Sequence, residues 1–180
     1  MIDYGQFRFA APPRTGGTWL LHAIASAGLG DGSKAHLHTN APPDPHKLTV
    51  SLVRDPCDWL ASYYQVLQGG HTGAPMVDEL IDITRAANSF DDFIRTYLVE
   101  MPGQVTRIML YYHSDSYIRT NDLSWAAYDL FETLGAPTRL ALVAAGAPPI
   151  NRGTDIPAWS PTLRARVMEA ESELVEQFEF

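Results

Sequence analysis

Short apolar runs alternate along the chain with longer segments in which apolar residues recur every three or four positions. The runs at 7–11, 48–53 and 105–112 predict buried strands, and another short strand is expected near 34–38. The longer segments predict amphipathic helices. These helices are expected at 17–27, 56–67, 77–87, 90–100, 123–134 and 138–145, and in a carboxyl-terminal stretch opened by Ser160-Pro161.

Alternation of strands and helices is typical of an α/β fold. We therefore expect a three-layer sandwich in which helices flank both faces of a central parallel β-sheet. A chain of 180 residues, 46% of them hydrophobic, can bury a core without metal or disulfide bonds. No internal repeat or linker divides it, so one domain spanning residues 1–180 is predicted.

The net charge and the cysteine content indicate which kinds of binding partner and which cellular compartment to expect. The formal net charge is −8, from 21 acidic and 13 basic residues, which argues against nonspecific binding to nucleic acid or to an anionic membrane. Cys57 is the only cysteine, which excludes an intrachain disulfide and fits a reducing cytoplasm. The first residues lack a basic segment followed by an apolar run, and no apolar stretch is long enough to span a membrane. We expect a cytoplasmic protein.

The strand at 7–11 runs into a glycine loop, residues 13–18, that opens the first helix. Gly16-Gly17 allows backbone N–H groups to turn toward a ligand at the positive end of that helix. Arg14 adds a charge, and Thr15 and Thr18 add hydroxyls, a set of donors that suits phosphate or sulfate oxygens. The alternative is an ordinary strand–turn–helix corner whose glycines only shape the turn.

A second basic residue follows the strand at 48–53. In an open parallel sheet the ligand crevice lies outside the carboxyl ends of the strands, so Arg54 is expected beside the glycine loop. Pro56 suits the first turn of the next helix. The apolar face of that helix leaves Ser62 to point elsewhere. Arg54 and Ser62 are therefore predicted to share one anion.

These two segments together resemble the sulfotransferases that use 3′-phosphoadenosine 5′-phosphosulfate (PAPS). In that family a loop of the form Pro-Lys-Ser-Gly-Thr-Thr-Trp binds the 5′-phosphosulfate. Residues 13–19 match it, with Arg14 for lysine, Thr15 for serine and Gly17 for the first threonine. The family's 3′-phosphate motif is Arg-Asn/Asp-Pro, followed by Asp and then Ser-Tyr-Tyr. It is matched by Arg54-Asp55-Pro56, Asp58 and Ser62-Tyr63-Tyr64.

Three weaker matches accompany these motifs. Lys34-Ala35-His36-Leu37 is similar to the Lys-Thr-His-Leu segment that carries the family's catalytic base. The predicted strand ending at Tyr112 resembles a later strand that supplies an aromatic near the nucleotide. Asn151-Arg152-Gly153 resembles the Arg-Lys-Gly segment that closes over the 3′-phosphate.

The resemblance implies a P-loop NTPase-like fold and a PAPS-dependent sulfotransferase that needs no metal. His36 would be the general base for the acceptor. Lys34 and Arg14 would stabilise charge on the transferring group, because arginine holds its proton too tightly to act as a general acid. The residues implied to bind the nucleotide are Arg14, Thr15, Gly16, Gly17, Thr18, Trp19, Arg54, Ser62, Tyr112, Arg152 and Gly153.

Some assignments stay open at this point. His36 and His38 share one face of a strand, so either can be the base. A zinc site on this pair is not expected, since no acidic or cysteine ligand follows at a familiar spacing. Trp19 either stacks on adenine or packs in the core. The acceptor is a small molecule or a glycan, and the short chain leaves room for a homodimer that completes the acceptor pocket.

Two other functions are alternatives to the sulfotransferase. A P-loop nucleotide or nucleoside kinase needs Gly-Lys-Ser/Thr at the end of its loop, but the chain contains no Gly-Lys dipeptide. The other alternative is a module that binds PAPS, or its product adenosine 3′,5′-bisphosphate (PAP), without turnover.

Overall fold

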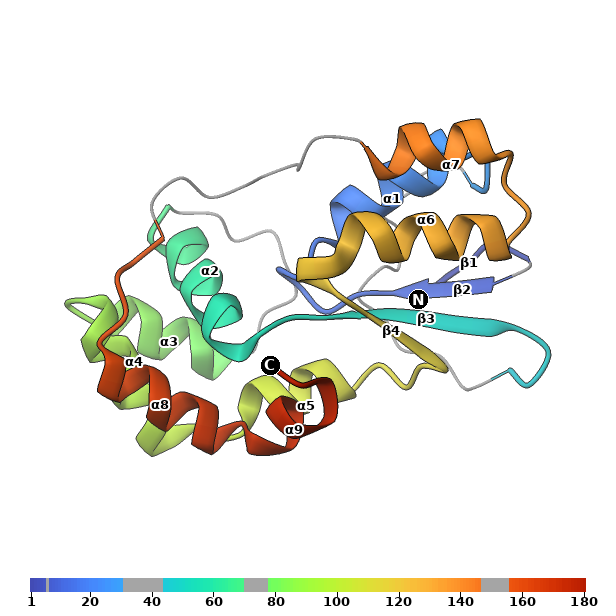
Figure 1. Ribbon diagram of the computed structural model, residues 1–180. Helices are drawn as coiled ribbons and strands as arrows, with labels where there is room; N and C mark the ends of the chain where they lie inside the picture. Colours follow the sequence, from blue (N-terminus) through green and yellow to red (C-terminus); the bar gives the residue numbers. More distant parts are fainter. Residues whose placement is uncertain (6, 31–43, 70–77, 147–155) are drawn as a thin grey trace. The chain divides into compact units, whose positions relative to one another are not determined.

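The computed structural model describes residues 1–5, 7–30, 44–69, 78–146 and 156–180 (Figure 1). Two compact units make up the chain, and each draws on two stretches of sequence. The first unit comprises 1–54 and 111–152, and the second comprises 55–110 and 153–180. The predicted strand near 34–38 lies outside the described residues.

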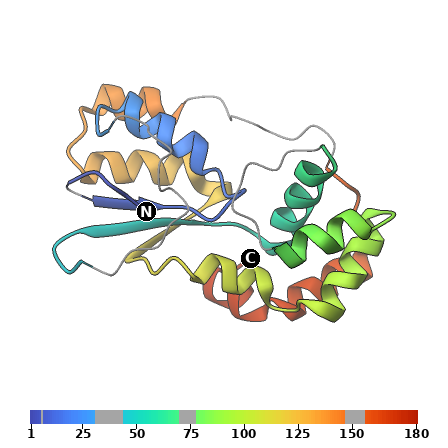
Figure 2. The same cartoon turned by 180° about the vertical axis from the view of Figure 1, so that it is seen from behind.

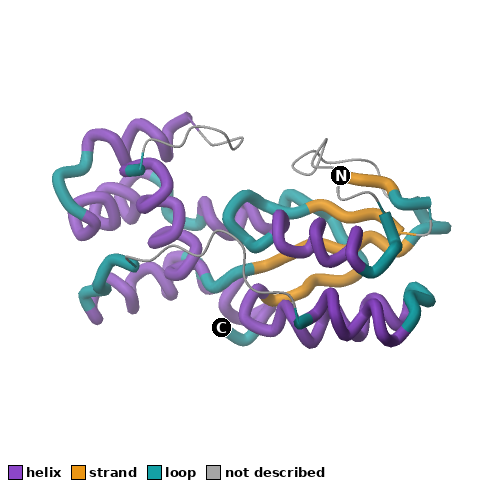
Figure 3. Tube along the Cα trace, turned by 90° about the horizontal axis from the view of Figure 1, so that it is seen from above, coloured by secondary structure: helices purple, strands orange, loops and turns teal. Residues whose placement is uncertain are grey.

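Within the described residues, a four-stranded sheet forms the centre of the first unit. Its strands run side by side in the order β1-β2-β3-β4 (Figure 3). Strand β1 pairs antiparallel with β2, whereas β2, β3 and β4 are parallel to one another. The bounds are Ile2–Asp3 for β1, Phe7–Ala10 for β2, Leu48–Val53 for β3 and Ser116–Arg119 for β4.

One face of this sheet is covered by three helices, α1 (Gly17–Ser26), α6 (Leu123–Thr133) and α7 (Thr138–Ala145), as Figures 1 and 2 show. Successive side chains of a strand point to opposite faces, so alternate strand residues supply the core under the helices. The strand residues of this core include Phe7, Phe9, Val50, Leu52 and Ile118. They pack with helix residues that include Leu20, Leu21, Ile24 and Phe131.

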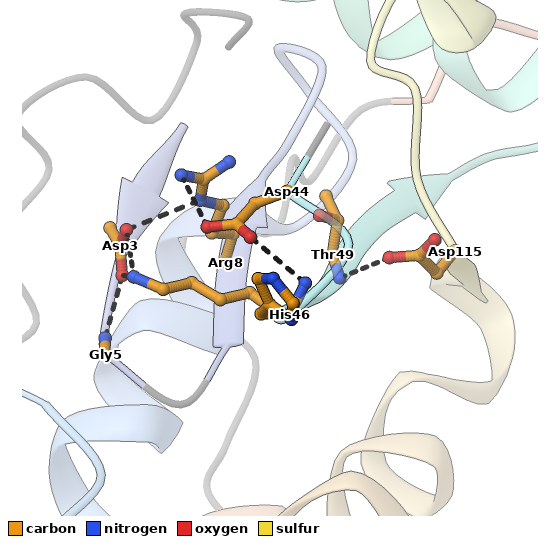
Figure 4. A network of polar contacts seen from close by, with 8 residues as sticks. Asp3, Gly5, Arg8, Asp44, His46, Thr49 and Asp115 are labelled. Carbon is orange, nitrogen blue, oxygen red and sulfur yellow. Dashed lines mark hydrogen bonds and ion pairs between the residues drawn. The ribbon is translucent and has the colours of Figure 1, made fainter. Parts of the chain in front are cut away.

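Charged side chains surround the strand ends opposite the glycine loop (Figure 4). Lys47 Nζ lies 2.7 Å from Asp3 Oδ2, and Arg8 contacts both Asp3 and Asp44 at 3.4 Å. Asp115 Oδ2 accepts a 2.8 Å hydrogen bond from the backbone N–H of Thr49, just before β4 begins. These contacts tie β1 and β2 to the segment before β3, and β3 to the segment before β4.

The second unit is helical. The helices are α2 (Pro56–Gln68), α3 (Asp78–Ala86), α4 (Phe90–Glu100), α5 (Gln104–Leu110), α8 (Pro161–Ala170) and α9 (Ser172–Phe178). Asp55 caps α2 by accepting from the N–H of Asp58 at 2.9 Å. Ser89 caps α4 by accepting from the N–H of Asp92 at 3.2 Å.

A buried carboxylate joins the helices of this unit. Glu171, between α8 and α9, is 1% exposed. Its Oε2 accepts from the N–H of Thr106 at 2.7 Å and from the Thr106 hydroxyl at 2.6 Å, and its Oε1 accepts from the Tyr97 hydroxyl. The Tyr97 oxygen in turn accepts from the N–H of Val105 at 3.2 Å. We call Glu171, Tyr97, Val105 and Thr106 the Glu171 cluster.

The prediction of an α/β fold around a mostly parallel sheet is confirmed. The predicted strand at 105–112 is wrong, because 104–110 forms helix α5. Val105, Met109 and Tyr112 are buried at helical spacing, and Glu171 accepts from an N–H in the first turn of α5. The residues have high strand propensity, but tertiary contacts override it.

The strand expected at 105–112 occurs instead at β4, six residues beyond the end of α5. It has only four residues, Ser116 to Arg119, with polar residues on both sides, so its sequence signal is weak. Tyr112, expected on a strand, lies just after α5.

Candidate functional site

The glycine loop connects β2 to α1 at the carboxyl end of β2. Arg14 and Gly16 both adopt positive φ angles, 65° and 90°, and Gly16 is the N-cap of α1. Glycine adopts this conformation without steric cost, which explains its presence at the cap. The helix begins at Gly17, as predicted from the sequence to the residue.

The carbonyl groups of three consecutive loop residues accept hydrogen bonds from other parts of the first unit. Arg14 O accepts from Arg54 at 2.8 Å, and Gly16 O accepts from the N–H of Leu20 at 3.1 Å. Thr15 O accepts from the hydroxyl of Thr120 at 2.9 Å. A trans peptide is planar, with its C=O and N–H on opposite sides. The N–H groups that follow these carbonyls, those of residues 15–17, therefore point away from the groups that hold the loop.

Those N–H groups have no acceptor in the part of the chain that the structure describes. No hydrogen bond there takes up the N–H of Thr15, Gly16, Gly17 or Thr18. Thr15 and Gly17 are buried. Buried backbone donors normally find an acceptor, and the first N–H groups of a helix carry its positive dipole end. The loop thus presents donors suited to an anion.

Two arginines add positive charge to this edge of the sheet. Arg54 follows the last residue of β3, and its guanidinium binds the Arg14 carbonyl, so the two residues are in contact. This places Arg54 beside the glycine loop, as the parallel-sheet argument predicts. Both residues are half-buried, and burial lowers the pKa of Arg14.

The two threonines of the loop, Thr15 and Thr18, differ in how deeply they are buried. Thr15 is fully buried, and its hydroxyl donates to the Pro12 carbonyl at 2.7 Å. That proton is therefore engaged within the loop and not directed at a ligand. Thr18 is half-buried in the first turn of α1.

Trp19 belongs to the core of the first unit. Its side chain is 5% exposed and packs with the residues that lie between the sheet and its helices. This burial favours packing over adenine stacking, the two roles that the sequence leaves open. Tyr112 is also 5% exposed, and burial raises the pKa of its hydroxyl to about 12. Its carbonyl accepts from Ser114 and Tyr117.

The remaining predicted residues belong to the second unit or lie outside the described residues. Ser62 belongs to the second unit, on α2, where it is 9% exposed. Lys34, His36, Arg152 and Gly153 lie outside the described residues, as does His38. The structure thus brings together Arg14 to Thr18 and Arg54.

Sequence reasoning missed Thr120 and Leu123. Thr120 follows β4 and opens a short 3₁₀ turn, and Leu123 begins α6. Both contact the glycine loop, because β4 is parallel to β3 and its carboxyl end lies at the same edge of the sheet. Only correct placement of β4 in the sequence would have found them.

The described residues hold neither a cluster of metal-ligand groups nor a reactive cysteine. Over the described residues, no three histidine, cysteine, aspartate or glutamate side chains gather as metal ligands would. Cys57 is buried in the second unit, and burial raises the pKa of its thiol to about 12, which keeps it protonated at neutral pH. None of the described helices has the length and apolar character needed to cross a membrane.

Comparison of the chain with protein-family models, with curated proteins and with solved structures yields no match. The glycine loop and its contacts therefore carry the functional argument.

Proposed function

We propose that the protein is a sulfotransferase that moves a sulfuryl group from PAPS to an acceptor hydroxyl or amine, on a P-loop NTPase-like fold. The observation that carries the proposal is the row of N–H groups from Thr15 to Thr18, which has no acceptor among the described residues and lies beside Arg14 and Arg54. Charge-assisted hydrogen bonds of this kind suit the oxygens of a phosphosulfate.

In the proposed reaction the acceptor oxygen or nitrogen attacks sulfur in line, and the bond from sulfur to the bridging phosphate oxygen breaks. His36 removes the acceptor proton, and PAP leaves. The loop N–H groups, Arg14 and Lys34 stabilise the charge that develops on the transferring group and on the leaving oxygen. Arg54, Ser62 and Arg152 bind the 3′-phosphate. Protein cations supply the neutralisation that magnesium supplies in phosphoryl transfer.

Nucleotide binding tests the proposal most directly. Calorimetry should show that the wild type binds PAP roughly ten- to a hundredfold more tightly than AMP, because a charge-assisted phosphate contact is worth about 1.5–3 kcal/mol. Arg54→Ala should remove most of this preference. Arg85→Ala, an exposed arginine of α3, is the matched control and should keep it. Equal affinities of the wild type for the two nucleotides would overturn the proposal.

Transfer assays separate the enzyme from its alternatives. In single-turnover assays with labelled PAPS, His36→Ala should lose about 10²–10⁴ in rate while PAP affinity stays within about threefold. His38→Ala should lose less, and the reverse result would move the base to His38. Binding without transfer to any acceptor would favour the non-catalytic module. Transfer should survive EDTA, whereas activity with ATP that disappears on chelation would favour a kinase.

A further inference from the structure

Thr120 links three segments that are distant in sequence. Its hydroxyl lies 2.9 Å from the carbonyl oxygen of Thr15 in the glycine loop and 3.1 Å from that of Val53, the last residue of β3. Thr120 itself follows β4 directly. A hydroxyl has one proton, so the two carbonyls share a single donor. The loop is thus attached to the carboxyl ends of both β3 and β4.

The bond to Thr15 also sets the direction of the next N–H. In the planar peptide between Thr15 and Gly16, the carbonyl and the N–H point in opposite directions. Holding the Thr15 carbonyl toward Thr120 therefore turns the Gly16 N–H the other way. Glycine allows this peptide to rotate more freely than any other residue would, so the orientation needs an external contact to maintain it.

An apolar contact from the same turn supports this orientation. A Cβ atom built on Gly16 would lie 3.0 Å from Cδ2 of Leu123, which shows how closely α6 approaches the loop. Arg119 and Asp122 form a 2.7 Å ion pair across the turn that contains Thr120. The turn between β4 and α6 is thus held at both ends while Thr120 and Leu123 contact the loop.

We propose that Thr120 is a positioning residue that aims the Gly16 N–H at the 5′-phosphosulfate of the donor. The inference rests on the proposed function, and it adds a residue that touches no ligand. Its effect is specific to one end of the nucleotide, because Thr120 contacts the glycine loop, which is proposed to hold the 5′ group.

The test compares two ligands on three variants of the full chain. Thr120→Val keeps the shape of the side chain and removes the hydroxyl, and Thr120→Ser restores the hydroxyl. Thr133→Val is the matched control, because the Thr133 hydroxyl donates to Asp129 O within α6, remote from the loop in sequence. The ligands are PAP and adenosine 3′-monophosphate, which lacks the 5′ group. Calorimetry measures both affinities, and the melting temperature reports folding.

Thr120→Val should bind PAP about tenfold more weakly and bind adenosine 3′-monophosphate unchanged, since one charge-assisted hydrogen bond is lost. Thr120→Ser should recover most of the affinity for PAP, and Thr133→Val should behave as wild type. Equal loss for both ligands would reduce Thr120 to a general structural role and overturn the inference. Wild-type affinity for PAP in Thr120→Val would overturn it as well, with the proposed function intact.

Two further outcomes complete the test. If the wild type binds neither ligand, the proposed function fails and this inference fails with it. If Thr120→Val does not fold, NMR spectra of the backbone amide groups in Thr120→Ser and Thr120→Ala test the inference instead. On addition of PAP the Gly16 resonance should shift as in wild type for serine and by less for alanine. Equal shifts in these two variants would contradict a role for the hydroxyl.

Discussion

The glycine loop and the Glu171 cluster each contain several N–H and O–H donors, but they differ in whether those donors have acceptors. In the Glu171 cluster, the two carboxylate oxygens accept from the Thr106 N–H, the Thr106 hydroxyl and the Tyr97 hydroxyl. In the glycine loop, the carbonyls accept hydrogen bonds while the N–H groups from Thr15 to Thr18 find no acceptor in the described residues.

This difference separates a structural centre from a region whose donors are available to a ligand. A buried polar group that is fully hydrogen-bonded stabilises the fold and has nothing left for a ligand. Burial and the adjacent Glu171 carboxylate raise the pKa of Tyr97, so its proton stays in the cluster at neutral pH. Buried donors without acceptors lower the stability of the fold, and they remain available to an anion. Substitutions in the two regions should therefore affect different measurements.

Removing the carboxylate should have the largest effect on stability. Glu171→Ala deprives the donors of Thr106 and Tyr97 of their acceptor in a buried site, and each unsatisfied donor costs about 1–3 kcal/mol. We expect urea unfolding to show a loss of about 3 kcal/mol or more. Glu173→Ala, exposed in the first turn of α9, is the control and should stay within about 0.5 kcal/mol of wild type.

A less severe change makes the same test if Glu171→Ala does not fold. Glu171→Gln retains one oxygen acceptor and should lose less stability than alanine. If both variants lower the free energy of unfolding by less than about 0.5 kcal/mol, the proposed difference between the cluster and the loop is wrong.

Adding a methyl group to the loop should lower the free energy of unfolding by less than Glu171→Ala does. It should, in addition, weaken the binding of PAP. Gly16→Ala places a Cβ on a residue with φ of 90° and 3.0 Å from Leu123, so we expect a loss of about 1–2 kcal/mol in the free energy of unfolding. Gly135→Ala is matched, because Gly135 has φ of 78° but no neighbour within 4 Å. Urea unfolding should show a loss for both, whereas calorimetry should show about tenfold weaker PAP binding only for Gly16→Ala.

The double variant Gly16→Ala with Leu123→Ala sharpens this result by removing the crowded contact. Part of the PAP affinity should return. If Gly135→Ala weakens PAP binding as much as Gly16→Ala does, the loop has no special role.

The exposed polar network around Asp3 should have the smallest effect on stability. It is the third region in this comparison. Hydrogen bonds from Lys47 and from the Gly5 N–H hold the pKa of Asp3 at about 2, below its usual 3.8. A lowered pKa means that the ionised form stabilises the fold above about pH 4, and that this contribution disappears as the pH falls through about 2. The Asp3 side chain is 43% exposed, so we expect its contribution to the free energy of unfolding to be less than about 1 kcal/mol.

Urea unfolding between about pH 2 and pH 5 measures this contribution. Asp3→Asn should be less stable than wild type at the upper end of the range, and the difference should shrink toward the lower end. Lys47→Met removes the principal partner and should reduce the same pH dependence. A difference that grows as the pH falls would contradict the assignment.

Local sequence signals predicted the parts of the site that local chemistry controls. Gly16-Gly17 and the apolar run before them predicted the start of α1, because a positive φ and a helix N-terminus are properties of a few adjacent residues. The apolar residues of β3 predicted that strand to its last residue, and so the position of Arg54.

Contacts between distant segments decided the rest. The chain from 104 to 110 is helical in spite of its strand propensity, because helical spacing buries Val105 and Met109 and because Glu171 binds its first turn. Strand β4 has four residues and exists through its pairing with β3.

The sequence by itself determined the α/β alternation, the loop and its two arginines, since each depends on the conformational preferences of neighbouring residues. Only the tertiary structure decided that Thr120 and Leu123 contact the loop and that Trp19 packs in the core. Those outcomes depend on which strands become neighbours in the sheet. Such pairing is stabilised by burial and hydrogen bonds between segments that no short window of sequence contains.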